Sequence, residues 1–146
     1  MDFNQDIDTF TSRLARSARD IKRARENFLE LIHHWKTLSK NRFGDMVIIE
    51  LLPESKGFAG LVLGKAFGIS ISPLITEEAG MIEAVVTVPS LSQEQVEIGR
   101  FTMDREGKLI GDTHADADNP FESSVSARIF LAVLKAVLES SVAVKG

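Results

Sequence analysis

The chain has 146 residues, of which 44% are hydrophobic and 26% are charged, and it contains no cysteine. A chain of this length and composition folds as one domain without a disulfide or a structural metal. The missing cysteines exclude disulfides, thiolate catalysis and cysteine-ligated zinc. The charge is divided, because residues 1–42 carry a net +3 and the remainder carries −7. A basic segment on an acidic body can bind a polyanion or pair with an acidic surface of the same protein.

Large apolar side chains recur with heptad spacing over the first forty residues, which predicts a helical region over residues 1–42. Asp2 and Gln5 form a predicted capping box at the start of this helix, and the segment from Asn41 to Gly44 is expected to end it. Some 38 helical residues would span roughly 57 Å, against a domain diameter of about 40 Å. We therefore expect either a break near residues 9–12, where helix propensity is poor, or a second copy of the chain that covers the stripe. The positions of the stripe are Phe3, Ile7, Phe10, Leu14, Ser17, Ile21, Ala24, Phe28, Leu31, Trp35 and Leu38.

From residue 45 onward the hydrophobic period changes to that of β-strands. Six apolar segments separated by short turn sequences predict an antiparallel meander over residues 45–111. Pro73 lacks an N–H and should lie at an edge or at the end of a strand. The predicted strands are 46–52, 58–63, 66–72, 81–88, 96–103 and 108–110.

Asn119 followed by Pro120 predicts the start of a second helix over residues 119–144. Nine of the ten residues in 129–138 are apolar, so this segment should be buried on most sides or be half core and half interface. The expected fold is α+β in a single domain: a long N-terminal helix, a five- to six-stranded antiparallel meander, and a C-terminal helix packed on one face of the sheet. Phe28 and Trp35 should be core residues.

The polar loop before the second helix is the chain's best candidate for a metal or catalytic site. Its candidate metal ligands are Asp112, His114, Asp116 and Asp118. Counted from the first of them, however, Ala117 stands where a calcium loop needs glycine, and Glu122 comes one residue early for the bidentate ligand. The segment 112–122 is therefore either a metal or small-ligand site, or a solvated turn whose last residue caps the final helix.

Six basic side chains and one acidic side chain lie between residues 13 and 25. Four arginines of this basic segment are candidates for phosphate contacts: Arg13, Arg16, Arg19 and Arg23. The same segment can form intrahelical pairs, such as Arg16 with Asp20. It contains no interleaved aromatic residues and no motif that reads bases. Nucleic acid, if it binds, should bind weakly and without sequence preference.

These patterns favour a non-catalytic, small homodimeric binding protein, of the adaptor or chaperone-like kind, that recognises another protein. The alternatives are a weak nucleic-acid-associated protein that uses residues 13–25, and a small-ligand or metal-dependent enzyme with a site around residues 112–122. No export signal and no apolar run of bilayer length is present, so we expect a soluble cytoplasmic protein without a membrane partner. No cofactor motif is present, and we expect no cofactor.

Overall fold

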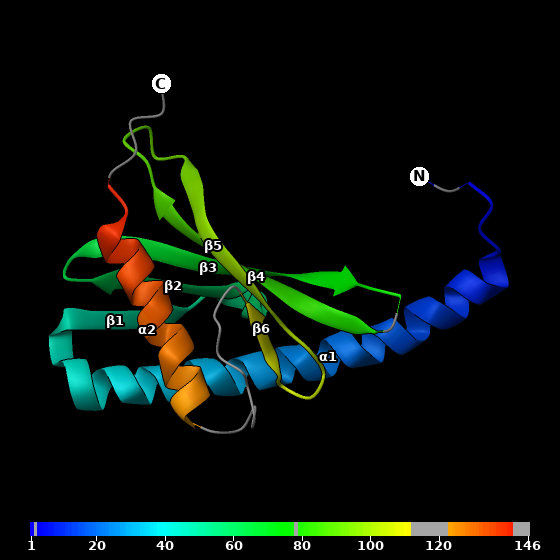
Figure 1. The fold of residues 1–146 in the computed structure, drawn as a ribbon, viewed down its shortest axis with the longest axis horizontal. Coiled ribbons are helices and arrows are strands. Elements are labelled where there is room, and N and C mark those ends of the chain that lie inside the picture. Colours follow the sequence, from blue (N-terminus) through cyan, green and yellow to red (C-terminus); the bar gives the residue numbers. More distant parts are fainter. Residues whose placement is uncertain (2, 78, 112–122, 142–146) are drawn as a thin grey trace.

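Two helices cover one face of a six-stranded antiparallel sheet in the computed structural model, which describes residues 1, 3–77, 79–111 and 123–141 (Figure 1). The expected α+β arrangement is confirmed, and each strand lies close to its predicted position. The helices are α1 (Ile7–Leu38) and α2 (Ser123–Glu139). The strands are β1 (Val47–Leu51), β2 (Gly57–Val62), β3 (Lys65–Ile75), β4 (Gly80–Pro89), β5 (Gln95–Met103) and β6 (Leu109–Gly111). A π-helical turn η1 (Ser39–Phe43) and the 3₁₀ turns η2 (Gly44–Met46) and η3 (Pro53–Ser55) flank β1.

Helix α1 is a single uninterrupted helix of 32 residues. It begins later than predicted, because the side chain of Asp6 accepts a hydrogen bond from the N–H of Thr9 and forms the N-cap. The predicted capping residue, Asp2, lies outside the described residues. Of the two expected alternatives, the break near residues 9–12 does not occur: the hydroxyl of Thr11 donates to the carbonyl of Ile7 and is satisfied within the helix. At 1.5 Å per residue α1 spans roughly 48 Å, and its N-terminal part projects beyond the sheet (Figure 1).

The sheet is a meander in which every strand pairs with the next in sequence. Pro73 lies inside β3, but β2 pairs with β3 only as far as Ser70. The N–H of Ile71 points toward β2 and donates to the carbonyl of Lys56. Two residues later the missing N–H of Pro73 points to the same side, where β2 has already ended. The proline is therefore tolerated because this part of β3 is a local edge, as its chemistry predicted.

The core lies between the sheet and the two helices and is centred on Trp35. The indole of Trp35 is fully buried and stacks on Phe130 of α2 with ring centroids 4.8 Å apart. It meets Phe58 of β2 edge-on at 5.9 Å, and its Nε1–H donates to the carbonyl and hydroxyl of Ser126. Phe28 is also fully buried. The expectation that Phe28 and Trp35 are core residues is confirmed, and Trp35 joins α1, α2 and the sheet.

Helix α2 is half core and half surface. Its buried side chains include Phe130, while Leu131 and Leu138 are 49% and 44% exposed. The predicted start of this helix at Asn119 lies outside the described residues. Within the described residues, no helix combines the length and the apolarity that crossing a bilayer requires. The other buried residues of α2 are Val125, Ile129, Val133, Leu134 and Val137.

The central position of Trp35 gives the first prediction. Trp35→Ala should lower the free energy of unfolding by about 3–5 kcal/mol, because it opens a cavity where two helices and the sheet meet. Urea unfolding followed by circular dichroism measures this loss, since the variant has no indole left to report by fluorescence. The exposed neighbour His33 supplies the control, and His33→Ala should change stability by less than about 0.5 kcal/mol. A loss below about 1 kcal/mol in Trp35→Ala would contradict the assignment.

Candidate protein-binding surfaces

The candidate metal loop falls outside the part of the chain that the structure describes. Asp112, His114, Asp116 and Asp118 all lie there, and their prediction stays a prediction. Among the described residues, no three His, Asp or Glu side chains gather closely enough to hold a metal ion. The candidate surfaces that follow are therefore built from residues 3–77, 79–111 and 123–141.

The basic segment of α1 is partly engaged within the fold. Arg13 is half-buried, and its guanidinium donates to the carbonyl of Thr76 at 3.0 Å. Arg16 is exposed and lies close enough to Asp20 to lower the pKa of that carboxyl. The two remaining candidates, both exposed on α1, are Arg19 and Arg23.

Asp20 anchors α1 to the start of β4. Its side chain is buried, and its carboxylate accepts hydrogen bonds from the N–H of Gly80 and from the guanidinium of Arg105, both at 3.2 Å. Burial raises the pKa of Asp20, but these two donors and the positive charges of Arg105 and Arg16 outweigh it, so the pKa lies below its ordinary value. The backbones of α1 and β4 also approach each other closely here, because a Cβ built on Gly80 would lie 2.6 Å from the carbonyl oxygen of Ser17.

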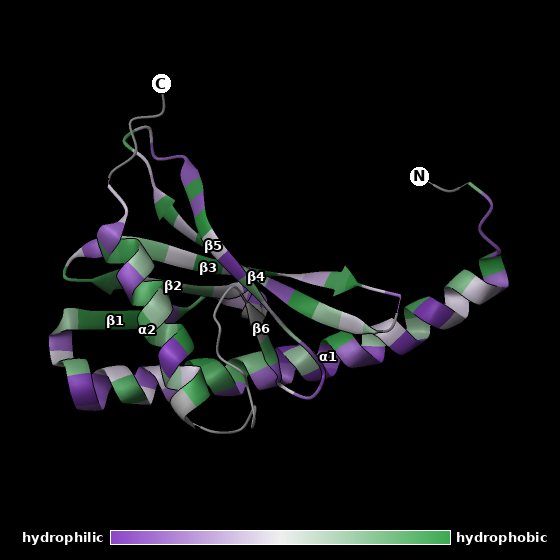
Figure 2. Cartoon of the chain, in the orientation of Figure 1, coloured by the Kyte–Doolittle hydropathy of each residue, from purple (hydrophilic) through white to green (hydrophobic). Residues whose placement is uncertain are grey.

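N-terminal to this anchor, the apolar stripe of α1 continues without a cover. We call Phe3, which precedes the helix, and Ile7, Phe10 and Leu14, which lie on it, the N-terminal stripe; their side chains are 84%, 76%, 44% and 44% exposed. Figure 2 shows hydrophobic residues recurring along the projecting part of α1. Heptad spacing places Ile7, Phe10 and Leu14 on the helix face that carries Ala24 and Phe28 inside the core. The stripe is thus one apolar face, covered by the sheet at one end and exposed at the other.

At the opposite end of α1 a cleft of about 490 Å³ separates the helix from β1. One wall is formed by residues at the end of α1 and in η1, including Lys36 and Lys40, and the other by residues 47–49 of β1. A second hollow, of about 270 Å³, lies on the outer face of β1 to β3 and shares Ile48 with the first. We call the first hollow the β1 cleft. Its lining residues are Lys36, Thr37, Ser39, Lys40, Gly44, Asp45, Val47, Ile48 and Ile49.

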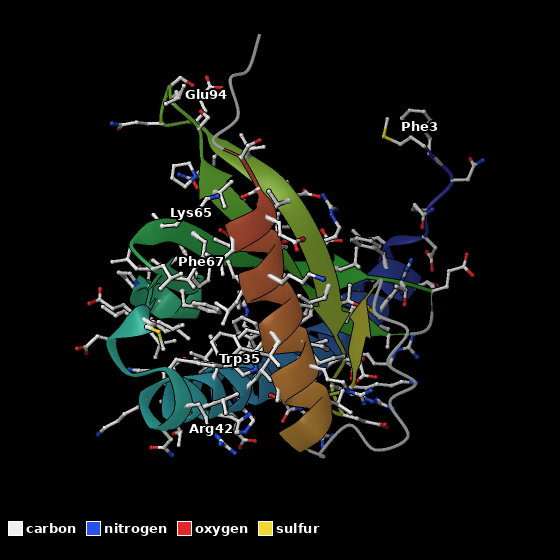
Figure 3. The ribbon with its side chains drawn as sticks, turned by 60° about the vertical axis from the view of Figure 1, so that its left-hand side comes forward. Phe3, Trp35, Arg42, Lys65, Phe67 and Glu94 are labelled. Atoms are coloured by element: carbon white, nitrogen blue, oxygen red, sulfur yellow. The ribbon has the colours of Figure 1, made fainter. Side chains whose placement is uncertain are left out.

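The two surfaces lie at opposite ends of the molecule. Figure 3 shows Phe3 far from Arg42, which stands in η1, with Trp35 between them. Sequence reasoning found the N-terminal stripe but missed the β1 cleft. A signal for the cleft was present, because Lys36 and Lys40 are four residues apart and share one helix face beside an apolar strand. No protein-family model, no curated protein and no solved structure matches the chain.

The environment of Asp20 gives the second prediction. Its folded pKa is depressed, so its contribution to stability is present above about pH 4, the unfolded value, and is lost as the pH falls through the folded pKa. Asp20→Asn should lower the free energy of unfolding by about 1–3 kcal/mol at pH 7. The difference between wild type and variant should narrow as the pH falls below about 4.

Urea unfolding of both proteins between pH 7 and pH 2.5 measures this difference directly. The control is Asp45→Asn, which removes an exposed carboxylate and should change stability by less than about 0.5 kcal/mol at pH 7. A gap between wild type and Asp20→Asn that stays constant or widens toward low pH would show that the carboxylate is not held in its charged form by Gly80 and Arg105.

Proposed function

We propose that this chain is a non-catalytic, homodimeric binding protein, of the adaptor or chaperone-like kind, that recognises another protein. The N-terminal stripe is the observation that carries the proposal. Monomeric proteins rarely expose a contiguous apolar patch of more than a few hundred Å², and such patches mark interaction sites. Ile7, Phe10 and Leu14 form an exposed row on the projecting part of α1, and Phe3 stands just before it, so this row is a candidate site of that kind.

A second copy of the chain is the occupant that best fits the N-terminal stripe. The stripe continues the heptad pattern of α1, and a heptad seam is complementary to another helix of the same pattern. Copies that pair antiparallel about a twofold axis between Ile7 and Phe10 set Ile7 of one copy against Phe10 of the other. The same register brings Leu14 of one copy beside the segment that carries Phe3 and precedes α1 in the other, so the three exposed apolar side chains on α1 are covered.

Charge and helix dipoles favour the antiparallel arrangement over the parallel one. Asp6 and Asp8 lie at the tip of the projecting segment, whereas Arg13 and Arg16 lie toward the sheet. Antiparallel pairing brings the acidic tip of one copy toward the basic segment of the other, while parallel pairing opposes like charges. In antiparallel helices the macrodipoles also point in opposite directions, and their interaction is attractive. The two bodies then lie at opposite ends of the pair, with their β1 clefts facing outward.

Nucleic acid is the second candidate partner, supported by the exposed side chains of Arg16, Arg19 and Arg23. Arg13 donates to Thr76, and Arg16 lies near Asp20, so part of the predicted row already acts within the fold. This favours a protein partner over a polyanion. Binding of a labelled duplex that persists at physiological salt would reverse the ranking, because weak phosphate contacts are lost steeply as salt rises.

The third prediction concerns the oligomeric state. The wild-type chain at micromolar concentration should have twice its monomer mass of 16.1 kDa in light scattering. The double substitution Ile7→Glu with Phe10→Glu should give the monomer mass, because it places four like charges in the paired seam. Both side chains are exposed, so the thermal melting of the body should change little.

A matched control uses the exposed leucines of α2. Leu131→Glu with Leu138→Glu introduces the same charges on the other terminal helix and should leave the dimer intact. A wild-type mass near 16 kDa would refute the homodimer. Dissociation by the α2 pair but not by the α1 pair would show that the copies meet through α2.

A further inference from the structure

We propose that the open edge of β1 accepts an extended segment of a partner protein, which adds a seventh strand to the sheet and directs acidic residues toward Lys36 and Lys40. This inference rests on the proposed function, since it names the kind of segment that the protein would recognise. Strand addition of this type draws affinity from main-chain hydrogen bonds and specificity from the pockets on either side of the new strand.

The backbone of β1 presents its hydrogen-bonding groups at this edge. The backbone groups of Met46 and Leu52 face β2. The Met46 carbonyl accepts a hydrogen bond from the N–H of Leu63, and the Leu52 N–H donates to the carbonyl of Gly57. Alternation then turns the N–H and C=O groups of residues 47, 49 and 51 away from β2, to the side on which no described strand pairs. A segment of about five residues, roughly 17 Å long, would match this row.

Edge strands are usually protected, and β1 carries few of the usual protections. Folded proteins protect an edge with lysine, proline or a bulge, by making the strand very short, or by covering it with a helix or loop. Here the end of α1 and η1 lie on this side of β1, but the β1 cleft separates them from the strand. Residues 47–51 read Val-Ile-Ile-Glu-Leu, with no lysine and no proline, and their pairing with β2 is regular. Ile48 and Leu51 are 45% and 38% exposed, and Leu61 on β2, paired with Ile48, is 40% exposed. An added strand finds apolar partners there.

The β1 cleft supplies room and charge beside this edge. Its volume of about 490 Å³ lies within the range of protein ligand sites. Ser39 lines the cleft, is 3% exposed, and has a hydroxyl with no hydrogen-bond partner among the described residues. Buried hydroxyls are normally satisfied, so Ser39 is an exception that stands at the wall of the cleft. Ser39 also opens a π-helical turn, a geometry that is frequent at functional sites.

The charges that border the cleft select an acidic partner. Lys36 and Lys40 line it, and both are exposed, as is Arg42 in η1, while Asp45 is the one acidic residue in the lining. A second copy of β1 is a poorer occupant, because it offers a single acidic residue, Glu50, in place of one at each end of the segment. The favoured segment alternates apolar residues with small polar ones and is flanked by Asp or Glu.

The experiment titrates the full-length, ¹⁵N-labelled chain with a capped synthetic peptide of sequence EVTVTVE. We expect one peptide per protomer, shift changes centred on β1 and the β1 cleft, and slowed amide exchange at Val47, Ile49 and Leu51. The peptide KVTVTVK should bind about tenfold more weakly, because its charges are repelled by Lys36 and Lys40. The peptide EVTPTVE should not bind measurably, since proline removes a donor and breaks the strand.

Matched protein variants separate the charge effect from folding. Lys36→Glu with Lys40→Glu should weaken EVTVTVE binding about tenfold. Lys22→Glu with Arg25→Glu makes the same charge change on exposed positions of α1, and should change the affinity less than twofold. No binding at millimolar peptide, protection of another surface, or equal effects of the two variants would overturn the proposal.

Light scattering on the same samples keeps this inference distinct from the proposed homodimer. Loss of the dimer in Lys36→Glu with Lys40→Glu would mean that the β1 edge holds a second copy, and the proposal would be wrong. A monomeric wild type that still binds EVTVTVE along β1 would refute the homodimer and leave the strand-addition site standing.

Discussion

The close approach of α1 to Gly80 is the contact on which the rest of the structure depends. A side chain at Gly80 would press on the backbone of Ser17, so glycine is needed for the helix to lie this near the start of β4. Asp20 closes the contact from the helix side by accepting from Gly80 and from Arg105. A buried carboxylate is stable only where donors and positive charge surround it, and here they do. The contact thereby fixes where α1 crosses the sheet.

Both candidate surfaces follow from that crossing. On one side of it the stripe is buried in the core, and on the other side the same face reaches beyond the sheet and stays exposed at Ile7 and Phe10. At its far end α1 stops beside the edge strand β1, where the π-helical turn turns the chain and leaves the β1 cleft. Because the two surfaces lie at opposite ends of the molecule, a second copy and a partner segment could be held at the same time (Figure 3).

The elements could be predicted from the sequence because their periods are strong, whereas the surfaces depend on contacts between distant residues. The heptad stripe does not reveal which of its residues are covered, since Phe10 and Phe28 belong to the same pattern. Phe10 is exposed and Phe28 is buried because they lie on opposite sides of the Asp20–Gly80 contact. The sequence left open whether α1 breaks near residues 9–12, and it does not break there, because poor propensity costs only a fraction of a kcal/mol per residue and the Asp6 N-cap offsets part of that cost. The predicted meander already places β1 at an edge, but the β1 cleft was missed because it depends on where the end of α1 and η1 lie beside that strand.

A distance between two copies tests the central claim, the pairing of the projecting segments of α1, most directly. The chain has no cysteine, so Ala18→Cys places one nitroxide label per copy at an exposed site on α1. Antiparallel pairing centred between Ile7 and Phe10 separates the labels by roughly 28 Å along the helices and about 10 Å across them. Pulsed dipolar spectroscopy should therefore give one intermolecular distance of about 30 Å. No intermolecular coupling, or a distance well below about 20 Å as parallel pairing would give, would contradict the account.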